Sequence, residues 1–406
     1  MSRHPISGRE AVADVRNGMS DQGLMTKYHL SATGLLNLFS KLVEAGMLTE
    51  AELIDRLTPA TAEIDVDLTQ RPAPAAPMPG APALKWKFKT EGWVFSSPVV
   101  AANAVFFASW DGHLYSVDSG SGYLNWKFRT GDVIRSSPTY VSNTVYIGSW
   151  DRWFYAIDAT TGQERWRFPT KKEIWCAPVA REGSVYFTST DGYLYALDAI
   201  DGSARWKHKM GSPLFSWVES APAFFEDLII CGRHDGTLVG IDASSGKLNW
   251  SFETNGPVDS SPLVADSTVF FGSQAGFLHA LEARTGKEKW RYDAHWPIYS
   301  CPAILRGMVF FSSAGGNLHA VSAESGRERW TFKSPKSFLS SPAVSTNTVH
   351  FGSTDKFLHA LNAESGEELW RFGTANQIFS APKVSDRVIY FGSNDSWLYA
   401  LHEPFS

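Results

Sequence analysis

Hydrophobic and polar residues alternate in short runs over most of the chain, and the runs repeat with a fixed period. Tryptophan marks the period, because eight of the 16 tryptophans follow one another at 40 residues, with a single spacing of 44. One proline after Ser, Ala or Cys recurs in every unit at the same relative place. Self-similarity of this length is typical of repeat architectures. The marker tryptophans are Trp86, Trp126, Trp166, Trp206, Trp250, Trp290, Trp330 and Trp370.

Each unit contains four short runs that are typical of β-strands. In residues 136–170 these runs are TYV, TVYIGS, WFYAID and ERWRF, with Ser-Asn, Trp-Asp-Arg and Thr-Thr-Gly between them. Apolar alternation bounded by turn residues predicts four antiparallel strands, which we label A to D in chain order. Four strands in about 40 residues form one blade of a β-propeller. Eight units therefore predict an all-β, eight-bladed β-propeller over residues 84–406.

The two ends of the repeat region complement each other. The last unit supplies three strand-like runs and no fourth, whereas LKWKFKT at residues 84–90 precedes the first complete unit. We expect this early strand to complete the eighth blade beside the C-terminal strands. Such a 3+1 closure leaves no open sheet edge in the ring, and open edges promote aggregation.

Residues 1–58 follow a helical pattern instead. Apolar residues recur there at spacings of three and four, which predicts a small all-α domain of four short helices. The stretch 19–48 resembles a helix-turn-helix, with residues 31–46 in the place of a recognition helix. Residues 59–83 are rich in Pro and Ala, which predicts an extended linker.

Charge argues against polyanionic partners. The chain has 37 Lys plus Arg against 42 Asp plus Glu, and residues 1–60 hold six basic and seven acidic side chains. A DNA reader is normally basic on its recognition helix, so we expect the helical module to dock a protein or to oligomerise. The first residues lack the apolar region of a secretory signal, and no run of 18 apolar residues occurs, which predicts a cytoplasmic protein without membrane insertion.

The spacing Ala156-x-Asp158-x-x-x-Gly162-x-x-x-Trp166 recurs around the marker tryptophans. It resembles the tryptophan-docking motif of pyrroloquinoline-quinone (PQQ)-like propellers, and the barrel-assembly propellers share this repeat. The resemblance implies that each indole stacks between neighbouring blades and that the glycine permits a tight turn. Three units depart from the motif, with Ser116 or Gly240 in place of the alanine and Asn362 in place of the aspartate.

The resemblance also raises the question of catalysis. PQQ dehydrogenases resemble this propeller and use a calcium ion, an acidic catalytic residue and often a disulfide between adjacent cysteines. The present chain has no Cys-Cys pair and no cluster of acidic residues beyond its turns. We therefore expect no catalytic residue, no cofactor and no metal site. A PQQ-dependent dehydrogenase and a DNA-binding regulator with a sensory propeller are the alternatives.

Several residue types that often carry chemistry have a structural explanation here. We expect the recurrent turn aspartates to cap B–C turns, the cysteines to behave as small buried residues, and three C-strand histidines to pack where other blades use Tyr. The aspartates are Asp111, Asp151, Asp191, Asp235, Asp355 and Asp395, the cysteines are Cys176, Cys231 and Cys301, and the histidines are His279, His319 and His359.

Residues that break the repeat gather in the D–A and B–C connections. In an antiparallel blade both connections emerge on one face of the ring, which we call the loop face. Variation at one face of a repeat scaffold is typical of a recognition surface, so we expect a protein, peptide or small ligand to bind there, unless the aromatic rings only plug the channel. The candidate residues are Trp93, Phe95, Trp110, Arg135, Trp150, Trp175, Trp217, Glu219, His234, Asp259, His295, Trp296, Tyr299 and Phe379.

Overall fold

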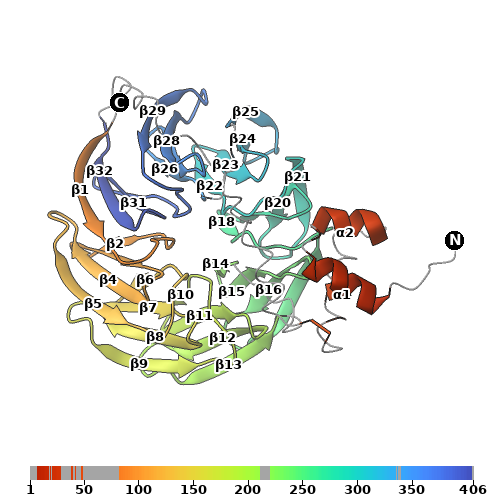
Figure 1. Cartoon of the computed structure of the whole chain (residues 1–406), viewed down its shortest axis with the longest axis horizontal. Helices are drawn as coiled ribbons and strands as arrows, with labels where there is room; N and C mark the ends of the chain where they lie inside the picture. The colour runs from red at the N-terminus through yellow and green to blue at the C-terminus, as the bar shows by residue number, and fades with distance from the viewer. Residues whose placement is uncertain are drawn as a thin grey trace. The chain divides into compact units, whose positions relative to one another are not determined.

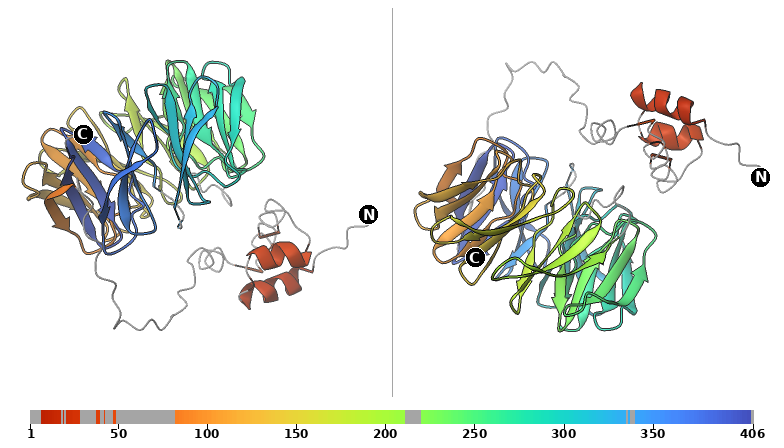
Figure 2. Two further views of the ribbon diagram at one scale, coloured as in Figure 1. Left: turned by 90° about the horizontal axis from the view of Figure 1, so that it is seen from above. Right: turned by 90° about the horizontal axis from the view of Figure 1, so that it is seen from below.

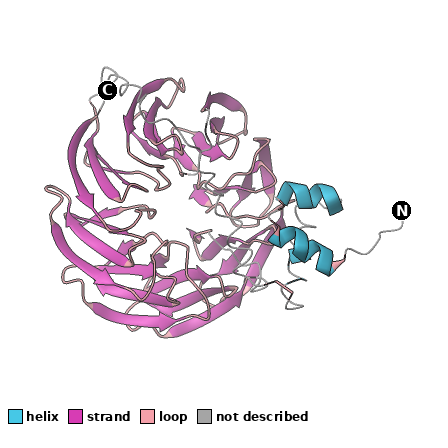
Figure 3. Cartoon of the chain, in the orientation of Figure 1, coloured by secondary structure: helices cyan, strands magenta, loops and turns pink. Residues whose placement is uncertain are grey.

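The chain divides into two compact units, Met1–Ala76 and Pro77–Ser406. Figure 3 separates them by secondary structure, with helices in the first unit and strands in the second. The computed structural model describes residues 7–17, 19, 21–28, 38–39, 42, 47–48, 82–210, 220–334, 336 and 340–404.

Eight four-stranded antiparallel sheets make up the second unit, and they are arranged as a ring (Figure 1). In the blade of β6 (Thr139–Val141), β7 (Thr144–Gly148), β8 (Trp153–Asp158) and β9 (Glu164–Pro169), the strands pair in chain order. The short A strand lies nearest the centre and the D strand lies at the circumference. The predicted all-β, eight-bladed β-propeller is confirmed.

The other complete blades repeat this order. Their strands are β2 (Val99–Ala101), β3 (Ala104–Ala108), β4 (His113–Asp118), β5 (Leu124–Arg129); β10 (Val179–Arg181), β11 (Ser184–Ser189), β12 (Tyr193–Asp198), β13 (Ala204–Lys209); β14 (Ala223–Phe225), β15 (Leu228–Gly232), β16 (Thr237–Asp242), β17 (Leu248–Glu253); β18 (Leu263–Ala265), β19 (Thr268–Gly272), β20 (Phe277–Glu282), β21 (Glu288–Asp293); β22 (Ala303–Leu305), β23 (Met308–Ser313), β24 (Asn317–Ser322), β25 (Glu328–Lys333); and β26 (Ala343–Ser345), β27 (Thr348–Gly352), β28 (Phe357–Asn362), β29 (Glu368–Gly373).

The eighth blade closes the ring with strands from both ends of the propeller. Its order is β1 (Ala83–Lys89), β32 (Trp397–His402), β31 (Val388–Ser393) and β30 (Lys383–Ser385). Strand β1 pairs antiparallel with β32, with Trp86 opposite Ala400, and the two lie side by side in both views of Figure 2. The predicted 3+1 closure is confirmed.

The tryptophans dock each blade onto the next one. The indole nitrogen of Trp126 donates to the carbonyl of Ala159 at 2.9 Å, and its ring lies against Gly162 in the C–D turn of the following blade. Gly162 has φ +72°, and a Cβ there would lie 2.6 Å from the indole. Glycine is therefore needed both for the turn and for the close approach. The same indole-to-carbonyl bond forms from Trp86, Trp166, Trp206, Trp290 and Trp330.

One departure from the motif changes this docking. A Cβ on Gly240 would lie 2.3 Å from the indole of Trp250 in the same blade, so the missing methyl group leaves room for the ring. The ring still lies against Gly286 of the next blade. Its buried indole nitrogen, however, has no acceptor among the described residues. Replacing the motif alanine by glycine thus retains the ring contact and loses the hydrogen bond.

The recurrent Ser-Pro pairs join the blades near the centre. The Oγ of Ser137 accepts the N–H of Ser97 in the preceding blade at 2.9 Å. The same link crosses the closure, where the Oγ of Ser97 accepts from the N–H of Ala381 at 3.0 Å. Seams between the blades are filled by apolar side chains of the B and C strands, and Phe154 stacks on Phe187 at 3.9 Å.

The first unit contains two described helices, α1 (Gly8–Arg16) and α2 (Asp21–Tyr28). The Oγ of Ser7 caps α1 by accepting the N–H of Glu10, and Leu24 of α2 is buried. The predicted recognition helix at 31–46 and linker at 59–83 fall largely outside the described residues, so the helix-turn-helix is not confirmed. No helix among the described residues has the length and apolarity needed to cross a bilayer.

The closure predicts the effect of truncation. A chain that begins at residue 82 retains β1 and should unfold in one cooperative transition, whereas a chain that begins at Val94 exposes the edge of β32. We expect the shorter chain to aggregate or to lose cooperativity, because an unpaired edge strand pairs with other chains. Thermal unfolding with light scattering measures both, and equal melting of the two chains would contradict the closing role of β1.

Candidate interaction face

Backbone hydrogen bonds bring the D–A and B–C connections together on one face. The N–H of Trp110 in a B–C turn donates to the carbonyl of Trp93 in the preceding D–A loop at 2.9 Å. Trp150 makes the equivalent bond to Val133 at 3.1 Å, and Asn394 does so in the eighth blade. Where both connections are described, the B–C turn is therefore hydrogen-bonded to the preceding D–A loop in six blades of the loop face.

The turn aspartates support this arrangement. Asp151 accepts the N–H of Trp153 within its own turn at 2.9 Å, which confirms the predicted turn cap. It also accepts the N–H of Gly131 in the D–A loop at 2.7 Å and the hydroxyl of Tyr155 at 2.6 Å. The sequence analysis missed these two partners. Caps from the equivalent carboxylates occur at Asp111, Asp191, Asp235, Asp355 and Asp395.

In two of the three blades with a C-strand histidine, the turn aspartate that bonds the tyrosine hydroxyl elsewhere is missing. In the blades of His279 and His319 the turn aspartate is replaced by Ala275 and Gly315, so a tyrosine hydroxyl would have no carboxylate to reach. His279 bonds Glu288 at 3.0 Å instead, and His319 bonds the Oγ of Ser313 at 3.0 Å. All three histidines are buried, as predicted.

Burial and neighbours set the charge of these histidines. Burial lowers the pKa of His319 to about 4, against a smaller opposing effect of Glu328. Burial also opposes the charge of His359, but its hydrogen bonds to Asp355 and Glu368 outweigh this and raise its pKa. The folded protein therefore disfavours the charged form of His319 and favours the charged form of His359.

The cysteines are largely part of the core. Cys176 and Cys231 are buried and burial raises the pKa of both thiols, which confirms the prediction for them. Cys176 occupies a position that is serine in other blades and makes the equivalent hydrogen bond. Its Sγ accepts the N–H of Thr188 at 3.3 Å, and in the first blade the Oγ of Ser96 accepts the N–H of Ala108. Cys301 is only half-buried, and in this respect the prediction was wrong.

Seven of the candidate residues form one contiguous group, which we call the aromatic cluster. Phe95 stacks on Phe379 of the neighbouring blade at 5.1 Å, and the guanidinium of Arg135 lies 5.0 Å from Phe95 and 4.8 Å from Trp175. Trp150 stacks on Trp175 at 5.2 Å. Trp110 packs against Trp93, Phe95 and Trp150, which completes the cluster of Trp93, Phe95, Trp110, Arg135, Trp150, Trp175 and Phe379.

Two members of the cluster hold polar atoms without partners. The indole nitrogens of Trp110 and Trp150 are buried and have no acceptor among the described residues. An unpaired buried donor costs roughly 1–3 kcal/mol. Trp93 at the edge of the cluster is 44% exposed. The cluster therefore combines an exposed aromatic edge with two unpaired buried donors.

The other described candidate residues lie in connections of the remaining blades. His234 bonds the carboxylate of Asp259 at 3.1 Å, and Gln274 donates to the same carboxylate. Trp296 is 54% exposed and rests on the backbone of Gly315, while His295 and Tyr299 are also exposed. This region is separate from the aromatic cluster and more polar. Trp217 and Glu219 lie outside the described residues.

A ring of eight four-stranded blades joined by docked tryptophans defines a PQQ-like β-propeller. The chain belongs to the family described as outer membrane protein assembly factor BamB, whose model matches residues 82–149, 112–261, 250–343 and 314–403. A search of the curated proteins finds no matching relative.

Solved structures share the fold at low sequence identity. BamB from Moraxella catarrhalis is 19% identical, with a TM-score of 0.72 over 79% of this chain and 100% of its own. A europium-containing methanol dehydrogenase is 13% identical, with a TM-score of 0.70 over 79% of this chain and 93% of its own. The quinohemoprotein alcohol dehydrogenase of Comamonas testosteroni is 15% identical, with a TM-score of 0.70 over 80% and 77%.

The dehydrogenases raise the question of whether a quinone and its metal ion fit this propeller. Calcium needs several converging oxygen ligands. Among the described residues no group of three or more His, Cys, Asp or Glu is placed to hold a metal ion, and the turn carboxylates are already bonded to backbone N–H groups and hydroxyls. The described residues therefore do not match that ligand set.

The low pKa of His319 predicts acid sensitivity. Because the folded pKa is about 4 and the unfolded pKa about 6.5, the unfolded state binds the proton first, and the folded state loses up to about 3 kcal/mol of stability between pH 7 and pH 4. His319→Tyr introduces the residue that four other blades hold at this position and should remove this loss. Denaturant unfolding at pH 7 and pH 4 measures it.

The exposed His402 provides the control, because His402→Gln removes a histidine that is not among the groups acting on His319. This variant should leave the pH dependence unchanged. An unaltered pH dependence in His319→Tyr would show that His319 is not the group responsible.

Proposed function

We propose that the protein is a non-catalytic binding protein or scaffold whose loop face binds a protein or peptide at the aromatic cluster. The observation that carries this proposal is the continuity of aromatic rings across four neighbouring blades together with the unpaired indole nitrogens of Trp110 and Trp150. Trp, Tyr and Arg are the residue types that dominate binding energy at protein interfaces. A partner that displaces these rings slightly can supply the missing acceptors.

The arrangement of Arg135 supports the same proposal. Its guanidinium is held between Phe95 and Trp175, so its orientation is restricted before a partner arrives. Restricted side chains lose less entropy on binding, which favours affinity. The family description, an assembly factor for outer membrane proteins, also supports a protein as the partner.

A quinone-dependent dehydrogenase is the second candidate, favoured by the similarity to two dehydrogenase structures. Titration with PQQ and calcium separates the two functions. In this test the quinone would bind saturably, and an alcohol or a sugar would be oxidised with a dye as electron acceptor. That result would favour a dehydrogenase over a non-catalytic binding protein.

The binding function predicts the result of a pull-down with a defined variant. Trp110→Ala, Trp150→Ala and Trp175→Ala together should lose the proteins that the intact chain captures. For a purified captured partner, the affinity should fall by more than about 100-fold, because aromatic anchors contribute about 2 kcal/mol or more each. Calorimetry on the purified pair measures the affinity.

The C–D turns and outer strands provide a matched control. Tyr123, Ile200 and Leu248 are also large, apolar and exposed, and their replacement by alanine should leave capture unchanged. Both variants must retain the melting temperature of the parent. Equal capture by the two variants would show that the aromatic cluster does not bind the partner.

A further inference from the structure

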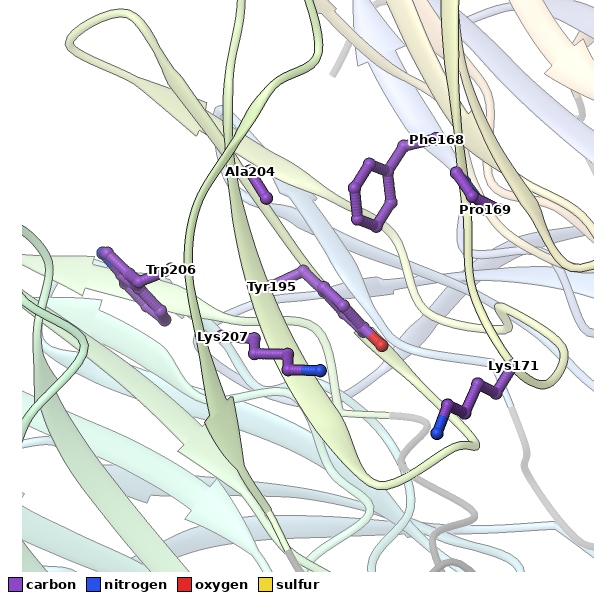
Figure 4. A pocket seen from close by; sticks show the side chains of 7 residues that line it. All are labelled: Phe168, Pro169, Lys171, Tyr195, Ala204, Trp206 and Lys207. Carbon is purple, nitrogen blue, oxygen red and sulfur yellow. The ribbon is translucent and has the colours of Figure 1, made fainter.

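A cavity of about 340 Å³ lies between the second and third blades, and none of its lining residues belongs to the aromatic cluster (Figure 4). One wall comes from the end of β9 and the loop that follows it, and the other comes from β12 and β13. The lining residues are Phe168, Pro169, Lys171, Tyr195, Ala204, Trp206 and Lys207.

The cavity exists because one residue breaks the repeat. Ala204 stands two residues before its docking tryptophan, and every other blade has Leu or Glu at that position. In two blades this longer side chain reaches over the C strand, where Glu288 bonds His279 and Glu368 bonds His359. The short Ala204 leaves the corresponding space above Tyr195 empty. The residues at the equivalent positions are Leu84, Leu124, Glu164, Leu248, Glu288, Glu328 and Glu368.

The walls of the cavity are aromatic. Phe168 meets Tyr195 edge to face, with ring centroids 5.6 Å apart and an interplanar angle of 62°. Tyr195 is held in this orientation because its hydroxyl donates to the buried carboxylate of Asp191 at 2.7 Å. Trp206 borders the cavity only along β13, because its indole lies on the opposite face of the blade, against Gly246 and bonded to Ala243 at 2.9 Å. The apolar walls are therefore rigid before any ligand binds.

Two ammonium groups border the cavity. Lys207 lies over the ring of Tyr193 at 4.7 Å from the centroid, and Lys171 follows Thr170 in the loop after β9. Neither ammonium forms an ion pair with a carboxylate of the described residues, and Asp191 accepts only the backbone N–H of Lys171, at 3.1 Å. Only this seam combines the short residue with a lysine at the position of Lys171.

We propose that this cavity binds a small organic anion that carries one or two aromatic rings. The rings lie over Ala204 against Phe168 and Tyr195, and the anionic group lies near Lys171 and Lys207. The volume falls at the lower end of the range of ligand pockets, which are mostly apolar with a few polar groups that fix orientation. The site shares with the loop face only the D–A connection that holds Lys171, contains no residue of the aromatic cluster, and does not depend on the function proposed for that cluster.

The test uses a fluorescent pair with the same rings. The anion 8-anilinonaphthalene-1-sulfonate should bind to the full chain about tenfold more tightly than the uncharged N-phenyl-1-naphthylamine, because two partly exposed ion pairs contribute up to about 1 kcal/mol each. Ala204→Leu fills the cavity with the residue that three other blades hold, and should weaken the binding of both probes by more than about tenfold.

The lysines are tested separately from the cavity. Lys171→Gln with Lys207→Gln should weaken the anion about tenfold and leave the neutral probe unchanged. Lys127→Gln, which alters the position equivalent to Lys207 two blades earlier, should change neither affinity.

Unchanged binding of the anion in Ala204→Leu, or equal affinity for both probes in the parent chain, would overturn the proposal. Loss of the anion in the Trp110, Trp150 and Trp175 triple variant would assign it to the aromatic cluster and would overturn the proposal as well.

Discussion

The contact on which the rest of the structure depends is that between an indole of one blade and a glycine of the next. A blade is a small sheet that cannot bury both of its faces alone, so its stability comes from its neighbours. The indole supplies a large flat apolar surface, and its nitrogen bonds a carbonyl of the following C–D turn, as Trp126 bonds Ala159. Because Trp86 on β1 makes the same contact with the first blade, the docking continues across the closure of the ring.

The residues that hold the blades together are therefore distinct from the residues of the proposed binding surface. The docking residues are nearly identical in all blades and lie toward the outside, whereas the loop face differs from blade to blade. In four blades the aspartate of the B–C turn is bonded to the D–A loop, so a change of side chain at Trp110 or Trp150 need not alter the backbone. The aromatic cluster and the cavity beside Ala204 both arise where the repeat is broken on an otherwise constant frame.

The sequence was sufficient for the fold because the fold is periodic. The spacing predicted the number of blades, the strand-like runs at the two ends predicted the closure by β1, and the resemblance to PQQ-like propellers implied the docking of the tryptophans. The aspartate caps were also predictable, since their partners are two residues away. Their bonds to Tyr155 and to the D–A loop were not, because these depend on how successive connections meet in space.

The aromatic cluster and the cavity beside Ala204 also differ in how far the sequence predicted them. The loop-face residues could be found by asking which positions vary at one face, but the contact between Arg135, Phe95 and Trp175 joins three blades and needs coordinates. The cavity was missed although its signal is present in the sequence. Comparing the residue two before each docking tryptophan would have singled out Ala204 as the one short side chain.

The most direct test of the docking contact compares two glycines with the same backbone. Gly162 and Gly307 both have φ +72°, but a Cβ on Gly162 would lie 2.6 Å from Trp126, whereas a Cβ on Gly307 meets nothing within 4 Å. Replacement by alanine imposes a backbone strain of about 1–2 kcal/mol on both. Denaturant unfolding should show an additional loss of about 1–3 kcal/mol in Gly162→Ala alone, from the displaced indole. Equal losses in the two variants would contradict the account.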